Sequence, residues 1–246
     1  MAINKAKSEF VSLASHQLLT PLANIRWYTE MLLEENNYSK EKRRKYFSKI
    51  ENSSQKMVEL VQALLNVSRI EMGTFLIETQ PTDILEIISS ILDELNYKIK
   101  EKNLSISKKF PKKLDTFIAD PRMLRVIFQN LLSNSVKYTR KNGQVEIFIS
   151  KNKENLTIQV TDNGYGIPED QKDKIFTKLF RADNVREEET DGTGLGLYIT
   201  KSIVDNSGGK IWFESTENKV TNFYVKYPLS GMKNLKGKKE IIIKQP

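Results

Sequence analysis

Apolar residues recur at spacings of three and four along two long stretches in the first third of the chain, which predicts two amphipathic helices. The first helix is expected over about 9–36, and its apolar seam consists of Val11, Ala14, Leu18, Ile25, Tyr28 and Leu32. The second is expected over about 40–72, and its heptad seam consists of Tyr46, Ile50, Ser53, Met57, Leu60, Leu64 and Val67. Joined by a turn at 36–39, they form a helical hairpin. Because two helices alone bury little apolar surface, we expect a dimer that closes a four-helix bundle.

The rest of the chain alternates shorter helix and strand patterns. Helices are expected over 82–103, 121–139 and 194–206. Strands are expected over 104–110, 114–119, 144–151, 156–161, 210–215 and 222–228. The polar segment 162–194, with its acidic run at 187–189, has the length of a functional lid. This order predicts an α+β fold in which helices cover one face of a mixed sheet, an α/β sandwich.

These patterns divide the chain into four parts. We expect a helical hairpin over 1–73, a linker over 74–81 where the periodicity lapses, an α/β domain over 82–229, and a basic, frayed or disordered tail over 230–246.

Composition narrows the classes of function. In 246 residues there is no cysteine, which excludes disulfides and thiolate metal sites, and a single histidine makes a histidine-based metal site implausible. No apolar run approaches the length of about 18 residues that a transmembrane helix needs. The net charge of +8 comes from lysines scattered over many elements, so a solvated surface is favoured over nucleic-acid binding.

His16 is the only histidine, and it stands two residues from both Ala14 and Leu18. At about 100° per residue it therefore faces away from the apolar seam. A lone histidine is more often a buried core residue, but an outward imidazole is largely neutral at pH 7 and keeps a nucleophilic lone pair. Pro21, five residues later, would normally break a helix and suggests a local kink beside the histidine.

Two amides mark the helix expected over 121–139. Asn130 and Asn134 are four residues apart and share one helix face. Their neutral oxygens suit Mg²⁺ that keeps most of its waters, and Lys137 is placed to reach a phosphate. Surface amides on an amphipathic helix would give the same pattern.

Two glycine-rich segments complete the candidate chemistry. In 162–168, Asp162 ends a strand and is able to accept a hydrogen bond from an exocyclic amine such as adenine N6, while Gly164 and Gly166 let the backbone pass close to a ring. In 192–197, glycines before a helix let backbone N–H groups surround phosphate oxygens. The second segment is neither a P-loop nor a dinucleotide fingerprint, because it lacks the Gly-Lys-Ser/Thr of the one and the strand-turn of the other.

Taken in order, these segments resemble the motifs of sensor histidine kinases of two-component systems. The segments 10–22, 130–138, 162–168, 175–181 and 192–197 resemble the H, N, G1, F and G2 boxes, respectively. The chain is similar to the cytoplasmic transmitter of such a kinase. The resemblance implies that 1–73 is a dimerisation and histidine-phosphotransfer hairpin. It also implies that 82–229 is an ATP-binding domain of the gyrase–Hsp90–histidine kinase–MutL type.

The resemblance implies the reaction and its residues. His16 would accept the γ-phosphoryl group of ATP and pass it to an aspartate of a response-regulator receiver domain, with Mg²⁺ held by Asn130 and Asn134. The implied catalytic residues are His16, Gln17, Thr20 and Arg181. The implied ATP-binding residues are Asn130, Asn134, Lys137, Tyr138, Asp162, Gly164, Gly166, Ile167, Phe180, Arg181, Gly192, Thr193, Gly194, Leu195, Gly196 and Leu197.

The same resemblance implies partners and a location. We expect a homodimer, a receiver-domain partner, an upstream sensor or membrane domain that is not in this chain, and no nucleic-acid partner. The chain would be the cytoplasmic portion of a membrane-associated sensor kinase.

The sequence departs from the family at two positions. Gln17 stands where Glu or Asp usually follows the histidine, and Leu19 stands where Arg or Lys is usual. An amide cannot act as a base at pH 7, and losing general-base help typically costs about 10²–10⁴ in rate. We therefore expect slow autophosphorylation, or a bias towards dephosphorylating the regulator in which Gln17 and Thr20 orient a water. Two alternatives remain: a nucleotide-binding conformational switch without turnover, and an ATPase or chaperone-like relative, against which the hairpin argues.

Overall fold

The computed structural model describes residues 2–34, 38–111, 114, 116–186, 192–237 and 239–242. The chain divides into two compact units, Met1–Leu65 and Asn66–Pro246. The expected turn residues 36–37, the acidic run 187–189 and the end of the tail at 243–246 lie outside the described residues. None of the described helices is both long and apolar enough to span a membrane.

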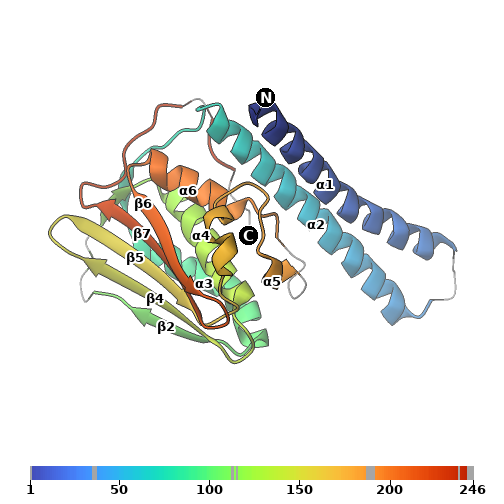
Figure 1. Cartoon of the computed structure of the whole chain (residues 1–246). Helices are drawn as coiled ribbons and strands as arrows, with labels where there is room; N and C mark the ends of the chain where they lie inside the picture. The colour runs from blue at the N-terminus through green and yellow to red at the C-terminus, as the bar shows by residue number, and fades with distance from the viewer. Residues whose placement is uncertain are drawn as a thin grey trace. The chain divides into compact units, whose positions relative to one another are not determined.

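The first unit is formed by α1 (Ala2–Glu34) and most of α2 (Lys40–Glu71), drawn from dark blue to teal in Figure 1. Residues 2–8, for which no helix was expected, continue α1 towards the N-terminus, and the helix runs through Pro21. Ser39 precedes α2 and caps its first turn, since its Oγ accepts from the N–H of Lys42 at 3.2 Å. The ring centroids of Tyr28 on α1 and Tyr46 on α2 are 5.5 Å apart, which joins the two helices.

The expected seam of the hairpin is only partly correct. Ala14 and Leu60 are buried, but Val11 is 54% exposed and does not face inward. A second set of large apolar side chains on the two helices is exposed in the single chain: Leu13, Leu19, Leu22, Trp27, Leu33, Phe47, Val58, Val61 and Leu65. A surface of this apolar content on a helical hairpin is typical of one that packs against another protein surface.

The second unit contains a five-stranded sheet in the order β2-β4-β5-β7-β6. Its strands are β2 (Ser105–Lys109), β4 (Gln144–Lys151), β5 (Asn155–Asp162), β6 (Lys210–Thr216) and β7 (Val220–Pro228). β2 pairs with β4 in parallel and every other pair is antiparallel, so the expected mixed sheet is confirmed. Burial alternates along β5, as it should in a sheet that has one face in the core.

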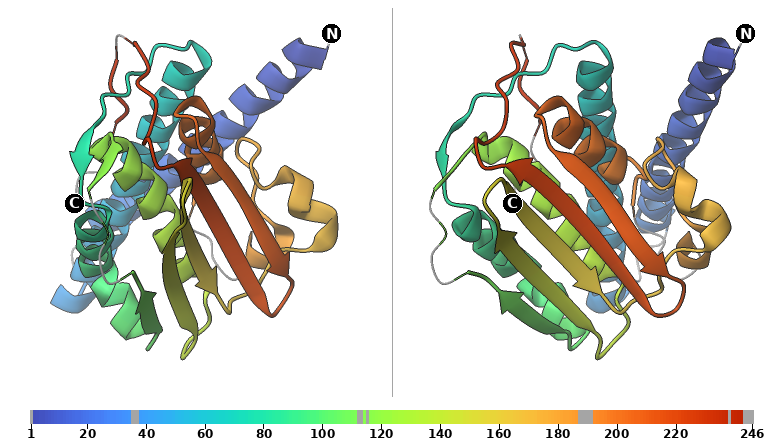
Figure 2. Two further views of the ribbon diagram at one scale, coloured as in Figure 1. Left: turned by 90° about the vertical axis from the view of Figure 1, so that its left-hand side faces the viewer. Right: turned by 60° about the vertical axis from the view of Figure 1, so that its left-hand side comes forward.

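Three helices cover the inner face of this sheet: α3 (Ile84–Glu101), α4 (Pro121–Tyr138) and α6 (Gly196–Asn206), as Figure 2 shows. Asp83 and Asp120 cap α3 and α4 by accepting from backbone N–H groups of the first turn. Because α4 packs on β5 and lies between α3 and α6, its apolar face is almost fully buried. This burial fixes the direction of its polar residues.

The structure corrects two expectations about the irregular segments. The segment 74–81 is not a free linker: Phe75 and Ile77 are each 1% exposed and form bridges with Lys239 and Leu235, and β1 (Gln80–Thr82) pairs with β3 (Phe117–Ala119). The described part of the tail is not frayed either, because Ile241 is 4% exposed. The segment 74–81 and the tail are far apart in the sequence and stabilise each other by this contact. A contact of this kind leaves no periodic pattern in either segment.

The tail also reaches the end of α2. The side-chain amide of Asn66 donates to the carbonyl of Ile242 at 2.8 Å and its oxygen accepts from the N–H of Ile242 at 2.7 Å. Arg69 donates to the carbonyl of Glu240. We call the described residues 230–237 and 239–242, with the segment 74–79, the C-terminal clasp. The clasp makes the last turns of α2 part of the second unit.

Candidate functional site

The candidate nucleotide site begins at α4, where Asn130 is held by α6. Its side-chain N–H group donates to the carbonyl of Gly196 at 3.2 Å and to Thr200 Oγ1 at 3.1 Å. These bonds occupy the nitrogen of the amide and leave Asn130 Oδ1 as an acceptor. A Cβ on Gly196 would lie 3.0 Å from that oxygen, so the glycine keeps space beside it.

The chemistry of the donor set fits Mg²⁺. Asn134 follows Asn130 by one turn, is half-buried, and makes no hydrogen bond through its side chain within the described residues. The described residues contain no cluster of three or more His, Cys, Asp or Glu side chains that could hold a metal by themselves. Two neutral amide oxygens suit a cation that takes its remaining ligands from phosphates and water.

Asp162 ends β5 with its carboxylate inside the domain, 4% exposed. Its Oδ1 accepts from the N–H of Gly164 at 3.1 Å and its Oδ2 accepts from Ser135 Oγ at 3.1 Å. Burial raises the pKa of this carboxyl to about 6, although both hydrogen bonds favour the charged form. Asp162 is therefore a buried acceptor that is still mostly ionised at pH 7.

The turn after Asp162 approaches two backbones so closely that only glycine fits. A Cβ on Gly164 would lie 2.1 Å from the carbonyl oxygen of Tyr138, at the end of α4. Gly166 has a φ of +65°, and a Cβ there would lie 2.3 Å from the carbonyl oxygen of Thr216. The N–H of Ile167, which is half-buried, donates to Ser215 Oγ at 3.0 Å. The turn is thus fixed between α4 and β6.

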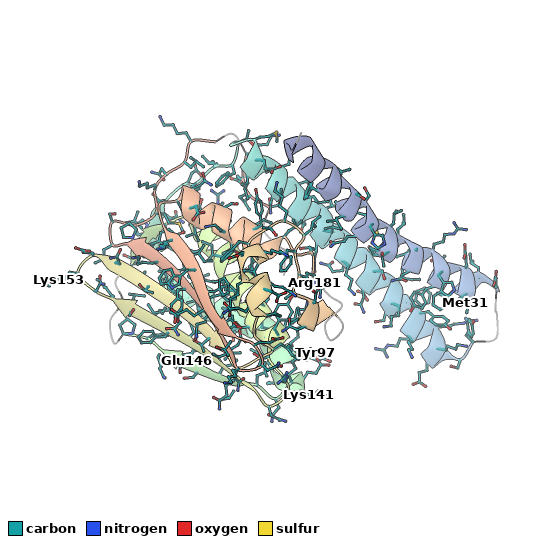
Figure 3. All side chains as sticks on the ribbon, viewed as in Figure 1. Met31, Tyr97, Lys141, Glu146, Lys153 and Arg181 are labelled. Atoms are coloured by element: carbon teal, nitrogen blue, oxygen red, sulfur yellow. The ribbon has the colours of Figure 1, made fainter. Side chains whose placement is uncertain are left out.

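Side chains from α4 and from the segment before α5 (Asp183–Arg186) converge on Gly192. A Cβ there would lie 2.9 Å from Lys137 Nζ, 3.9 Å from Arg181 Nε and 3.9 Å from the hydroxyl oxygen of Tyr138. Arg181, labelled in Figure 3, lies between the 3₁₀ helix η1 (Glu169–Lys174) and α5. Two cationic groups beside a glycine with a φ of +129° form a position suited to a phosphate group.

The rest of the glycine-rich segment packs on the residues before Arg181. Gly194 has a φ of +67°, and a Cβ there would lie 2.6 Å from the backbone carbon of Leu179 and 2.8 Å from the carbonyl oxygen of Phe180. Thr193 Oγ1 accepts from the N–H of Leu195 at 3.3 Å. Leu195 is fully buried, whereas Phe180 and Leu197 are half-buried. The structure therefore brings together the segments expected to bind ATP, all in the second unit.

The expected phospho-acceptor group lies on α1, in the first unit. The side chain of His16 is exposed, as expected from its direction, and Leu19 is 61% exposed. Thr20 Oγ1 donates to the carbonyl of His16 at 3.1 Å, so its proton is used within the helix. Gln17 is half-buried. Because Pro21 has no N–H, the carbonyl of Gln17 lacks its usual helical partner.

Several residues that the sequence did not single out support this site. Ser135 holds Asp162, Thr200 holds Asn130, and Asn184 donates to the carbonyl of Gly166 at 3.2 Å. Ser135 lies within the segment 130–138, and Thr200 and Asn184 each lie three residues after a motif segment. Only Ser135 gave a usable signal, because it is a polar residue in the apolar stripe of α4.

Two family models match the chain. Residues 6–73 match the His Kinase A (phospho-acceptor) domain, and residues 119–231 match the model described as histidine kinase-, DNA gyrase B-, and HSP90-like ATPase. The first match contains His16, and the second contains every residue of the candidate nucleotide site.

Curated proteins with similar sequences are histidine kinases. The chain is 34% identical over 230 residues to the circadian input-output histidine kinase CikA of Synechococcus elongatus, which covers 92% of the chain and 30% of CikA. It is 32% identical over 228 residues to the sensor protein kinase WalK of Staphylococcus aureus, which covers 92% of the chain and 54% of that protein. The chain thus spans between about a third and a half of the length of these relatives.

Solved structures that resemble this chain are also those of histidine kinases. The histidine kinase AdeS of Acinetobacter baumannii gives a TM-score of 0.72 at 18% identity, over 88% of this chain and 98% of that chain, which is a likeness of fold. The catalytic domain of histidine kinase ThkA gives 0.53 at 29% identity, over 61% of this chain and 97% of that chain. ThkA in complex with the response regulator protein TrrA gives 0.72 at 24% identity, over 89% of this chain and 61% of that chain.

Proposed function

The chain belongs to the histidine kinases, with a phospho-acceptor domain ahead of an ATPase domain, and from this premise we propose that it phosphorylates itself on His16 and then a response regulator. The observation that carries the proposal is the convergence of Lys137, Tyr138 and Arg181 on Gly192, because it gives the γ-phosphate of a nucleotide a cationic position in the ATPase domain. The exposed imidazole of His16 in the phospho-acceptor domain supplies the nucleophile.

ATP would be oriented from both ends. Asp162 accepts from the exocyclic amine of adenine, and the N–H groups of 192–197, before and at the start of α6, donate to phosphate oxygens. Lys137 and Arg181 offset the charge of the transferring group. Asn130 and Asn134 are the residues that would hold Mg²⁺, which when bound neutralises charge on the phosphates. Phosphoryl transfer depends mainly on such positioning and neutralisation, so the residues of the second unit carry most of the catalysis.

The chemistry at His16 has two steps. A ring nitrogen attacks the γ-phosphorus, the bond from phosphorus to the ADP oxygen breaks, and the imidazole must then lose its N–H proton. With Gln17 in place of a carboxylate that proton passes to water, which slows the step. In the second step a carboxylate of the regulator attacks the same phosphorus, the N–P bond breaks, and the imidazole regains a proton.

The partners follow from the family and from the surface of the hairpin. The exposed apolar side chains of α1 and α2 support a homodimer whose four helices bury them. The structure of ThkA with TrrA provides a precedent for a response-regulator partner. Input would come from a sensor or membrane domain outside this chain, which would place the chain on the cytoplasmic side of a membrane.

A phosphatase bias is the second candidate, and Gln17 favours it. An amide cannot take the imidazole proton, but with Thr20 it could orient a water towards an aspartyl phosphate on the regulator. In this reaction the Thr20 hydroxyl, which donates to the carbonyl of His16, first rotates away from that carbonyl so that it can contact the water.

A transfer assay separates the two candidates. The chain is labelled with γ-labelled ATP and Mg²⁺, then mixed with a purified receiver domain, and label is followed on both proteins. For a kinase, label leaves the chain and appears on the receiver, and His16→Ala abolishes it. For a phosphatase, the chain removes label from a pre-phosphorylated receiver faster than the receiver loses it alone, and Thr20→Ala slows this removal.

A further inference from the structure

Ser135 is a polar residue in the apolar stripe of α4. The neighbouring positions of the stripe, Leu124, Ile127, Phe128, Leu131 and Leu132, are at most 1% exposed, and Ser135 is 1% exposed. A hydroxyl buried in such a stripe costs free energy unless it is hydrogen-bonded. Its partner is the Oδ2 atom of Asp162, 3.1 Å away on β5. Since an ionised carboxylate only accepts, Ser135 is the donor.

The two bonds to Asp162 hold its carboxylate at both oxygens. The N–H of Gly164 donates to Oδ1 and the hydroxyl of Ser135 donates to Oδ2. A carboxylate has about four acceptor positions, so lone pairs remain for a ligand. With both oxygens held, the plane of the carboxylate is fixed before a ligand arrives. Ser135 itself is too deeply buried to be a ligand contact, so its effect on a ligand passes through Asp162.

We propose that Ser135 is a positioning residue for base recognition, which orients the carboxylate of Asp162 so that it selects purines carrying a 6-amino group. This inference rests on the proposed function, because it assigns Asp162 to adenine. The Ser135 hydroxyl also favours the charged form of Asp162, whose pKa burial raises, and an ionised carboxylate is the better acceptor for an amine. Ser135 therefore favours both the orientation and the ionised form of the Asp162 carboxylate.

The test compares ADP with IDP, in which an oxygen replaces the 6-amino group, by titration calorimetry on the full chain. Removing a hydrogen bond to a charged group weakens binding on the order of tenfold. Ser135→Ala is expected to weaken the binding of ADP by about that factor and to change the binding of IDP by less than about twofold. The preference for ADP over IDP therefore falls. In the Asp162→Asn background, Ser135→Ala is expected to add less than about twofold, because the two residues act as one unit.

A matched control is Ser207→Ala. Ser207 is also fully buried at the end of a helix, and its Oγ is 2.8 Å from the hydroxyl oxygen of Tyr227, away from the nucleotide site. This variant is expected to lower the melting temperature without changing the preference for ADP over IDP. It separates loss of a buried hydroxyl from loss of base recognition.

The outcomes distinguish this inference from the proposed function. If Ser135→Ala weakens ADP and IDP equally, leaves ADP unchanged, or adds its full effect to Asp162→Asn, Ser135 does not act through base recognition and the inference is overturned. If the unmodified chain binds neither nucleotide, the nucleotide assignment falls, and this inference falls with it.

Discussion

The side-chain amide of Asn130 on α4 donates to the backbone oxygen of Gly196 at 3.2 Å, at the first residue of α6. This bond joins the two segments that would bind Mg²⁺ and the phosphates. Because the nitrogen of the amide is used in this way, its oxygen is presented on the side of Gly196, where a Cβ would lie only 3.0 Å away. The amide and the glycine therefore act as one unit.

Gly196→Ala tests this pairing. The added methyl group would displace the oxygen of Asn130 by a few tenths of an ångström, without strain in the backbone, because Gly196 is helical and does not have a positive φ. We expect ADP binding in the presence of Mg²⁺ to weaken by about three- to tenfold, the cost of one misplaced ligand bond. Titration with and without Mg²⁺ measures the effect. An equal loss in both conditions would mean that the amide has no role towards the metal.

The buried carboxylate of Asp162 makes stability depend on pH in a defined direction. Its pKa is about 6 in the folded chain and near 4 when unfolded, so between these values the native state keeps a proton that the unfolded state has lost. The free energy of unfolding therefore falls as pH rises through this window. Above pH 6 the ionised carboxylate destabilises the fold on the order of 1–3 kcal/mol.

Asp162→Asn removes that charge, keeps an oxygen that accepts from the N–H of Gly164, and places an NH₂ group beside Ser135 Oγ, which can accept from it. We expect the variant to be more stable than the parent by about 1–3 kcal/mol at pH 8 and equal to it near pH 4, and to bind ADP measurably but more weakly than the parent. Urea unfolding at the two pH values measures the difference. If the variant is less stable than the parent at pH 8, burial of the ionised Asp162 carboxylate does not destabilise the fold.

Gln17→Glu restores a general base beside the nucleophile. Because a carboxylate takes the imidazole proton, we expect autophosphorylation to accelerate by at least about tenfold, within the range that general-base catalysis supplies. Initial rates of labelling at saturating ATP measure the change, and Leu19→Lys serves as a control that restores only the charge of the second departure. Equal rates for Gln17→Glu and the parent would show that proton removal at His16 does not limit the reaction.

Much of the fold follows from the sequence because its helices and strands carry local signals. The N-caps Asp83 and Asp120 and the alternation along β5 place the elements that form the sheet and its cover. The clasp did not follow, because Phe75 and Ile77 are buried only through partners near the other end of the chain. A short buried segment without periodicity is easily taken for a linker.

The site divides in the same way. Motif residues such as Asp162 and Gly164 were found by type and spacing. Their supporting contacts were not, because Ser135 and Thr200 act only through the packing of α4 against β5 and α6. The closeness of Lys137 to Gly192 likewise depends on the tertiary fold.

Asn66→Ala tests the clasp. Asn66 is 5% exposed and makes two hydrogen bonds with the backbone of Ile242, so its loss leaves a buried donor and acceptor without partners. We expect a loss of stability of about 1–3 kcal/mol in the second unit. Asn206→Ala, which removes an exposed amide bonded only within α6, is the matched control and should cost less than about 1 kcal/mol. Equal melting temperatures for the two variants would argue against the clasp.

The role of His16 as the phospho-acceptor is tested by labelling of the full chain with γ-labelled ATP and Mg²⁺, compared with His16→Ala. We expect slow incorporation of label that is acid-labile and base-stable, as a phosphohistidine is, and no label in the variant. Label of the same stability that persists in His16→Ala, or ATP hydrolysis without any label on the chain, would contradict the assignment of His16 as the phospho-acceptor.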